Sequence, residues 1–487
     1  MSKYSVTKEI RMTSDKGSGQ RPAGSSELSV PSLRSCRFVI RASSFFRHSS
    51  LVIRHLPTAL LLAVAAMWSS MALAQVDFEQ PPIDYLKAQP DDVITKLQAR
   101  IDAGEVELKR ERGLGYLRSV LDALNVPASS QALVYSKTSF QLRRISPRTP
   151  RAIYFGDEVY VGWVRGSDVM EFSAVDPKLG ANFYTLSQNE TGRPQFRRHT
   201  HTCLQCHGSS LTKGVPGHMV RSVYSKADGQ PVLGAGTYRS DHTSPLKERW
   251  GGWYVTGQHG SQRHLGNLFV NQVDNPREAD LDSGANVTDL KPYFRTAGYL
   301  SGHSDIVALM VLEHQTTMHN LITRANFLTQ ITLRDAAVMN KMLERSDDFC
   351  SESNERRINN AAEPVVKYLL FAGEARLTAP IVGTSNFAEE FATGGPRDKQ
   401  ERSLRELDLR GRLFKYPCSY LIYSAAFDEL PAAVKTRIYQ RLWDVLTGED
   451  TSEDFQHLTP VDRQAILAIL RDTKQGLPEY WRRGNDE

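Results

Sequence analysis

The chain has 487 residues and a formal net charge of +5. The 413 residues after position 74 suggest two or three domain-sized units. Residues 1–74 hold ten Lys or Arg and three Asp or Glu, so the formal charge without them is about −2. The apparent basicity therefore belongs to the N-terminal segment, and a nucleic-acid partner is not expected.

Residues 1–52 do not resemble the short basic region that precedes the apolar core of a signal peptide. The segment is rich in Ser and Arg, and it is predicted to be a disordered or over-extended leader. Under this hypothesis translation starts near Leu51 or Val52.

Residues 53–74 are predicted to form a secretory signal peptide. An apolar run over 56–67 follows Arg54 and His55, and Ala72-Leu73-Ala74 supplies an A-x-A cleavage signal before Gln75. The alternative is a membrane anchor, but the run is short for a bilayer span and Trp68-Ser69-Ser70 interrupts it. We therefore expect a periplasmic or otherwise secreted bacterial protein with no stable membrane span after cleavage.

Residues 75–130 are predicted to form a helical entry segment. Apolar residues recur at helical spacing over 93–101, ended by Gly104, and again over 116–124 before Pro127.

Residues 131–300 are predicted to be rich in β-strands and loops. Short strand-type runs separated by turn residues indicate a small antiparallel sheet. The expected strands cover 133–135, 152–155, 159–164, 169–172, 183–186, 220–224 and 253–256. The most distinctive motif of the chain follows the fifth of these strands and is expected in a loop.

Residues 301–487 are predicted to form a helical domain. The strongest pattern runs over 306–328, and others lie over 366–371, 421–427, 434–446 and 463–470, the last two after Pro431 and Pro460. The expected fold class is α+β, with the β-containing region packed on a C-terminal helical domain.

The motif is Cys203-Leu204-Gln205-Cys206-His207, the C-x-x-C-H pattern of covalent c-type haem attachment. The two thiols form thioethers with the haem vinyl groups, and the spacing matches the separation of those vinyls. His207 then lies beneath the ring as the proximal iron ligand. Cys203, Cys206 and His207 are therefore predicted to hold one covalent haem c. The β-containing region is then a haem-binding region, and the expected fold differs from the small all-helical cytochrome c fold.

The distal iron ligand is less well defined by the sequence. Met310, His314 and Met318 are spaced i, i+4, i+8 on the expected helix, so they share one face, and His314 is the preferred distal ligand. Met at this spacing is also typical of core packing. The alternatives are Met219, Met310, His242, His259, His264 or an open sixth position.

Two histidines follow a Gly-rich aromatic segment that begins at Arg249-Trp250. His259 or His264 could act as an acid or base beside a bound small oxidant, or these residues could simply form a core with locally satisfied polar groups.

Other uses of the cysteines are less favoured. A zinc site formed by His201, Cys203, Cys206 and His207 is sterically awkward because His207 directly follows Cys206, and a thioredoxin-like site would need a surrounding βαβ pattern. Outside the motif, Cys350 and Cys418 either form a disulfide or remain free.

Beyond the motif, several segments resemble a group of large, secreted, single-haem bacterial proteins known as cytochrome c domain-containing proteins. The resemblance rests on residues 144–150, 152–163, 250–267, 313–315 and 414–423, and it spans most of the chain after the leader. It implies haem binding and electron transfer, with a redox partner protein and no defined substrate.

Two functions follow from these patterns. The first is an exported monohaem electron carrier. The second is a periplasmic haem oxidoreductase of peroxidase type, with a substrate pocket over an open or displaceable distal site. The absence of a second C-x-x-C-H motif from the sequence favours the carrier.

Overall fold

The computed structural model describes residues 76–189, 192–270 and 275–482. The predicted leader over 1–52 and signal peptide over 53–74 lie outside the described residues. Met71–Glu487 form one unit. The predicted boundaries near residues 130 and 300 stay predictions.

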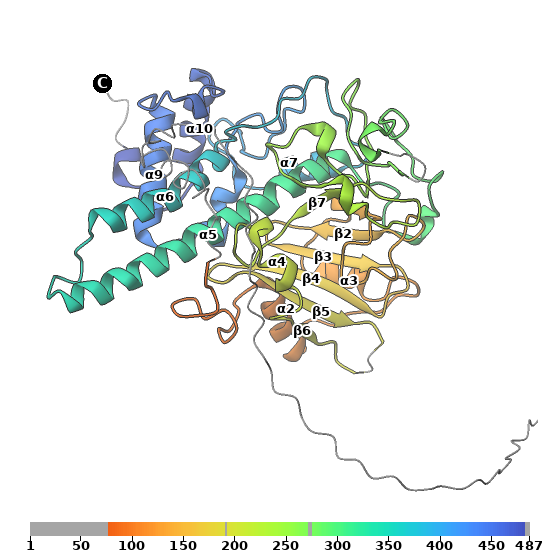
Figure 1. Ribbon diagram of the computed structural model, residues 1–487, viewed down its shortest axis with the longest axis horizontal. Helices are drawn as coiled ribbons and strands as arrows, with labels where there is room; N and C mark the ends of the chain where they lie inside the picture. Colours follow the sequence, from red (N-terminus) through yellow and green to blue (C-terminus); the bar gives the residue numbers. More distant parts are fainter. Residues whose placement is uncertain (1–75, 190–191, 271–274, 483–487) are drawn as a thin grey trace, which may run out of the picture. The chain divides into compact units, whose positions relative to one another are not determined.

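The sheet of this unit has seven antiparallel strands in the order β6-β5-β4-β3-β2-β1-β9. Figure 1 shows β2 to β6 next to one another in this order. Its strands are β1 (Ala132–Val134), β2 (Arg151–Phe155), β3 (Val159–Val164), β4 (Val169–Asp176), β5 (Gly180–Ser187), β6 (Phe196–Arg198) and β9 (Trp253–Tyr254). Six of the seven match predicted strands, and β6 was not predicted. β9 returns from far along the chain to pair with β1, with Leu133 opposite Tyr254.

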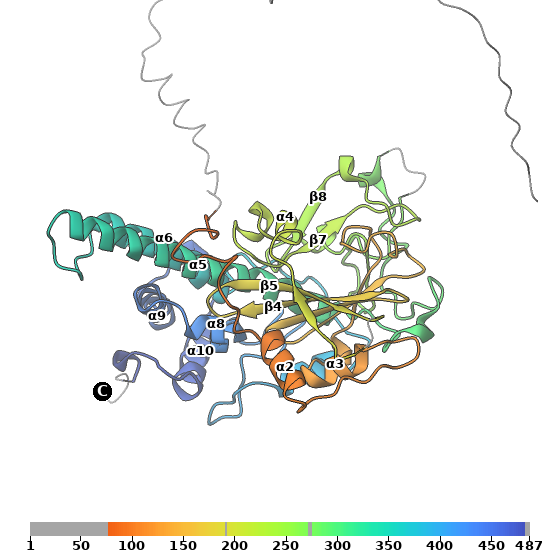
Figure 2. The same ribbon diagram turned by 90° about the horizontal axis from the view of Figure 1, so that it is seen from below.

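The two faces of the sheet differ in chemistry because side chains alternate along each strand. One face carries the apolar residues Tyr154, Val161 and Phe172, which pack into a core with α2 (Val93–Asp102) and α3 (Leu117–Ala123). The opposite face mixes polar groups, among them Ser173 and Glu171, with apolar residues such as Phe155 and Tyr160, which belong to the main core. Figure 2 shows α2 and α3 on one side of strands β4 and β5, and α4 (Leu204–His207) on the other.

The predicted entry helices are confirmed. In α2, Ile94, Leu97 and Ile101 are buried at helical spacing, and the Asp92 carboxylate caps the helix by accepting from the N–H groups of Ile94 and Thr95 at 3.0 Å.

The C-x-x-C-H motif forms a short helix, α4, where a loop was predicted, so that prediction was wrong. The His207 N–H donates to Cys203 O at 2.9 Å, which closes one helical turn. After α4, a separate two-stranded sheet pairs β7 (Val220–Val223) with β8 (Thr237–Ser240).

The predicted helix starting at residue 306 is confirmed but longer than expected. α5 spans Ile306–Met342, and the Asp305 carboxylate caps it by accepting from Val307 N–H at 2.8 Å. The prediction ended at residue 328 because later residues lose the apolar pattern, with Val338 and Met342 exposed. The helix continues because no Gly or Pro interrupts residues 329–342.

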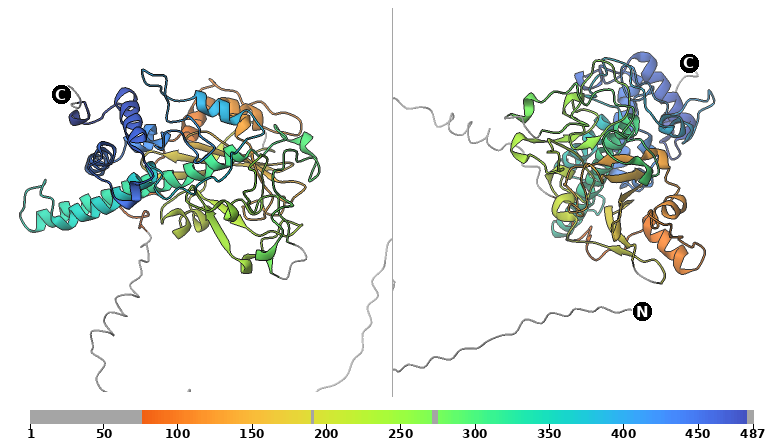
Figure 3. Two further views of the ribbon diagram at one scale, coloured as in Figure 1. Left: turned by 90° about the horizontal axis from the view of Figure 1, so that it is seen from above. Right: turned by 90° about the vertical axis from the view of Figure 1, so that its right-hand side faces the viewer.

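The C-terminal region is helical, as predicted. It contains α6 (Glu352–Leu369), α7 (Phe387–Thr393), α8 (Ala425–Asp428), α9 (Ala432–Thr447) and α10 (Pro460–Thr473). Figure 3 shows α5 running from the side of these helices to the sheet. α5 contributes Ile306, Val311 and Met318 to a core that also contains β-strand residues and the C-terminal helices.

The described residues thus form a mixed α and β structure with a C-terminal helical region, in agreement with the predicted class. In this part of the chain no helix combines the length and apolar character needed to cross a bilayer.

Candidate functional site

The three motif side chains lie on adjacent positions of one helical turn. Cys203, Cys206 and His207 are related by i, i+3 and i+4, positions that neighbour each other on a helix surface. Cys203 is half-buried, Cys206 is exposed, and both thiols are free. The intervening Leu204 packs on a small core that includes Phe78 and Phe327. Both cysteines of the motif are therefore at least partly accessible, while the apolar side chain of Leu204 anchors the turn.

The imidazole of His207 has a defined tautomer. Its Nδ1 lies 2.9 Å from Gly217 O, and because a carbonyl only accepts, Nδ1 must carry the proton. In a neutral ring this leaves the lone pair on Nε2, which has no hydrogen bond to any described residue. Burial lowers the pKa of His207 and so favours the neutral ring. This is the form of histidine that binds a metal.

The loop after the motif folds back on α4. Gly217 N–H donates to His207 O at 2.9 Å, which complements the bond from the His207 ring to Gly217 O. Within the loop, Thr212 Oγ1 donates to Val215 O at 2.8 Å. Residues 207 and 217 are therefore held together by two hydrogen bonds.

His207 lies over the mixed polar and apolar face of the sheet. The centroid of its ring is 4.8 Å from that of Phe183 on β5. Next to them, His218 Nε2 is 2.7 Å from Ser173 Oγ, and the His218 ring lies 4.4 Å from the ring of Tyr160. Burial, followed by the charges of His319 and His207, places the pKa of His218 well below its usual value.

An ion pair lies in the same region. Arg151 on β2 reaches across β3 to Glu171 on β4. A Cβ at Gly162 would overlap the Arg151 guanidinium, so this glycine makes room for the pair. Burial, with a contribution from Glu171, raises the pKa of the Cys203 thiol to about 11. A protonated thiol weighs against a thioredoxin-like role, which needs a thiolate.

The preferred distal ligand, His314, is buried on α5 with both ring nitrogens in hydrogen-bonding distance of other groups. Its Nδ1 is 2.8 Å from Nδ1 of His242, and its Nε2 is 2.8 Å from Ser419 Oγ. The ring is stacked against Tyr368 and Phe371. Burial keeps its pKa well below the ordinary value. Ligation through either nitrogen would displace one of these partners, so the assignment of His314 stays a prediction.

The two methionines beside His314 are buried in the main core. Met310 and Met318 lie in the core shared by α5 and the C-terminal helices. Their shared face on a helix is confirmed, and their packing matches the alternative core role. Met219 is half-buried and directly precedes β7.

The other histidine candidates are held by local bonds. His259 Nδ1 is 2.8 Å from Gln262 O, and its Nε2 accepts from Asn286 N–H at 2.9 Å. His264 Nδ1 accepts from Gly266 N–H at 3.0 Å. His242 Nε2 is buried and has no hydrogen-bond partner within the described structure. The contacts of His259 and His264 fit locally satisfied polar groups better than an acid or base facing a substrate.

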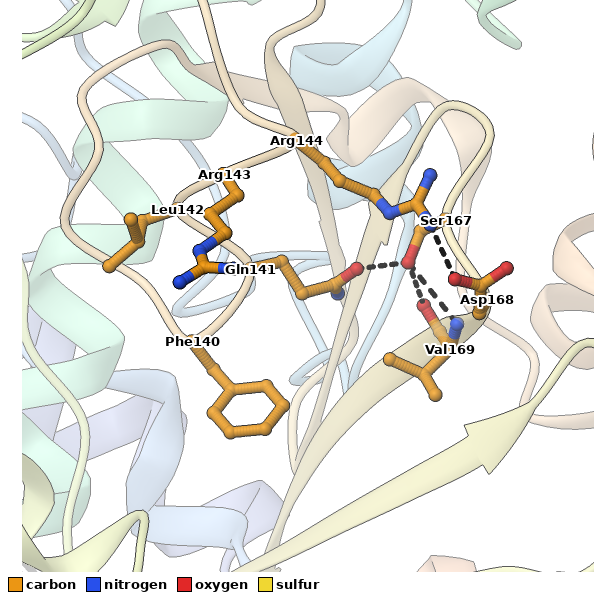
Figure 4. A pocket seen from close by; sticks show the side chains of 8 residues that line it. All are labelled: Phe140, Gln141, Leu142, Arg143, Arg144, Ser167, Asp168 and Val169. Atoms are coloured by element: carbon orange, nitrogen blue, oxygen red, sulfur yellow. Dashed lines mark hydrogen bonds and ion pairs between the residues drawn. The ribbon is translucent and has the colours of Figure 1, made fainter. Parts of the chain in front are cut away.

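Two pockets lie away from the motif. One, of about 500 Å³, is lined by residues 140–144 and 167–169, with Arg144 paired to Asp168 (Figure 4). The other, of about 830 Å³, lies between the sheet and the helical region and is lined by residues that include Phe155, Gln315 and Tyr420. Cys203, Cys206 and His207 line neither pocket.

The remaining cysteine alternatives can be compared with the structure. Cys350 is exposed, Cys418 is buried, and each is a free thiol, so the disulfide alternative is not formed. Within residues 76–189, 192–270 and 275–482, no group of three or more His, Cys, Asp or Glu is placed to hold a metal ion, so the zinc set is not assembled there.

Comparison of the chain with protein-family models, with curated proteins and with solved structures finds no match. The assignment of the site therefore depends on the motif and its surroundings.

The sequence did not indicate several residues that surround His207. Phe183 was expected only as part of a strand, and Gly217 and His218 fell between the motif and the strand predicted over 220–224, with no role assigned to them. Asn320, whose side chain contacts this loop, carried no signal except that it is a polar residue inside a long apolar helix pattern.

Proposed function

We propose that this chain is an exported monohaem c-type cytochrome that acts in electron transfer with a redox partner protein. The observation that carries the proposal is the state of His207 within C-x-x-C-H. Its Nδ1–H is fixed on Gly217 O, and its Nε2 has no bond to a described residue. Export rests on the predicted signal peptide.

The residues present fit a covalent haem c. Cys203 and Cys206 would hold it through thioethers, and His207 would ligate the iron from the proximal side. When bound, the haem supplies a one-electron couple at the iron. Phe183 lies against the His207 ring, and the loop at Gly217 keeps the imidazole in one orientation.

A peroxidase-type haem oxidoreductase is the second candidate. This candidate is favoured because both ring nitrogens of His314 lie within hydrogen-bonding distance of other groups, so the preferred distal residue has no free nitrogen to bind iron. Against it, neither of the two pockets described above is lined by Cys203, Cys206 or His207.

Optical and EPR spectra of the oxidised and reduced holoprotein test the proposal. A six-coordinate low-spin haem that does not bind carbon monoxide or peroxide supports the carrier. A high-spin haem that binds these ligands would overturn the carrier in favour of the oxidoreductase.

A pair of histidine variants tests the distal assignment. If His314 ligates the iron, His314→Ala changes the spectrum, while His303→Ala, a histidine beside the β1 end of the sheet, leaves it unchanged. An unchanged spectrum in His314→Ala would rule out His314 as the ligand.

A further inference from the structure

Asn320 on α5 makes two hydrogen bonds to the backbone of His218. Its Oδ1 accepts from His218 N–H at 2.8 Å, and its Nδ2 donates to His218 O at 2.6 Å. The Asn320 side chain is buried, with 1% of the residue exposed. It thereby satisfies two backbone groups that have no strand partner at this point.

The first of these bonds involves the same peptide unit that holds His207. Gly217 C=O and His218 N–H belong to one planar peptide group and point in opposite directions. Gly217 O accepts from His207 Nδ1–H at 2.9 Å, while His218 N–H donates to Asn320 Oδ1. A continuous series of hydrogen bonds therefore runs from Asn320 through one peptide unit to the His207 ring. Hydrogen bonds in such a series polarise and strengthen one another.

The close approach of α5 to this peptide requires glycine at position 217. A Cβ on Gly217 would overlap Asn320 Oδ1 and lie 3.1 Å from Thr212 Cβ. A second contact from α5 supports the same loop, because Arg324 Nη1 donates to Lys213 O at 2.6 Å. The loop is thus held by a rigid helix whose position is fixed by the main core.

We propose that Asn320 is a positioning residue for His207. Through the peptide between residues 217 and 218, it fixes the direction of the Gly217 carbonyl and increases its strength as an acceptor. A stronger acceptor makes the His207 ring more basic at Nε2 and so favours ferric over ferrous iron. This proposal rests on the proposed haem function.

The main experiment measures the reduction potential of the holoprotein. Asn320→Ala should weaken the bond to His207 Nδ1–H and change the ferric-to-ferrous equilibrium by about tenfold, the lower end of effects from such outer partners. For a one-electron couple this raises the potential by about 59 mV. Asn326→Ala is the matched control, because Asn326 is also buried on α5 and donates to a backbone carbonyl, that of Pro177, at 3.2 Å.

An isosteric variant separates positioning from simple loss of packing, and it replaces the Ala variant if that one does not fold. In Asn320→Asp the carboxyl keeps an acceptor for His218 N–H, and its protonated form, which burial favours, also keeps a donor for His218 O, so the potential should stay close to the wild-type value. The positioning role is overturned if Ala and Asp raise the potential equally, or if Asn320→Ala matches the Asn326→Ala control. If only the Asn320→Asp variant folds, a potential above the wild-type value overturns the positioning role.

A readout that does not use the haem tests the contact itself. Hydrogen exchange at the His218 amide should accelerate in Asn320→Ala and not in Asn326→Ala. Faster exchange with an unchanged potential would refute the positioning role and leave the haem proposal intact. A wild-type chain without covalent haem would refute the proposed function, whatever the exchange rates.

Discussion

His264 should make the folded chain lose stability in mild acid. Burial, followed by the charge of the nearby His259, lowers the pKa of His264 to about 3. Its Nδ1 accepts from Gly266 N–H, a bond that a protonated Nδ1 cannot make, and its ring lies edge-on to Trp250 at 5.4 Å between centroids. In the unfolded chain the imidazole titrates near a pKa of about 6.5.

The size of the effect follows from these two pKa values. Between them the unfolded state binds a proton that the folded state does not, so stability is present above about pH 6.5 and falls as the pH decreases toward the folded value. From pH 7.5 to pH 5 the loss is about 2 kcal/mol. A folded-state pKa of about 4 would give nearly the same figure, because the folded ring is neutral throughout this range.

Urea unfolding followed by tryptophan fluorescence at several pH values measures this loss. In His264→Gln the change in unfolding free energy between pH 7.5 and pH 5 should shrink by about 2 kcal/mol. His457→Gln, at an exposed position, is the control. If both variants keep the full pH dependence of the wild type, His264 is not the source and the reasoning is wrong.

Two further predictions concern the stability of the scaffold. Asp305→Ala should cost about 2 kcal/mol or more in urea unfolding, because Asp305 caps α5 and also accepts from Ser385 N–H at 2.7 Å; a cost below about 0.5 kcal/mol would contradict the capping role. Gly252→Ala should cost about 1–3 kcal/mol more than Gly448→Ala. Both glycines have φ above +80°, but a Cβ at Gly252 would lie 2.6 Å from Ser136 Cβ, whereas one at Gly448 meets nothing within 4 Å. Equal costs for the two variants would show that crowding at Gly252 is absent.

The strands could be predicted because their alternation is local. β3 matches its predicted range, Val159–Val164; β2 begins one residue earlier than predicted, and β5 is three residues longer at its start and one at its end. The pairing of β1 with β9 could not be predicted in the same way, because it depends on packing between distant segments. α5 was predicted too short because its last turns lack the apolar periodicity on which the prediction relied.

The residues of the site likewise divide into those that local sequence reveals and those that only tertiary folding brings together. Cys203, Cys206 and His207 are recognisable because their chemistry requires adjacent positions in sequence. The partners of His314 could not be inferred, since Ser419 and His242 reach it only through tertiary folding. The same holds for Asn320, which meets the loop at His218 from a helix about a hundred residues away.

The most direct test of the central claim is the intact mass of the chain produced in a host that attaches c-type haem. The account predicts one covalently bound haem on the wild type and on Cys350→Ala, an exposed cysteine outside the motif, and none on the Cys203→Ala, Cys206→Ala double variant. A wild-type chain that carries no haem, with both motif thiols open to alkylation, would contradict the account.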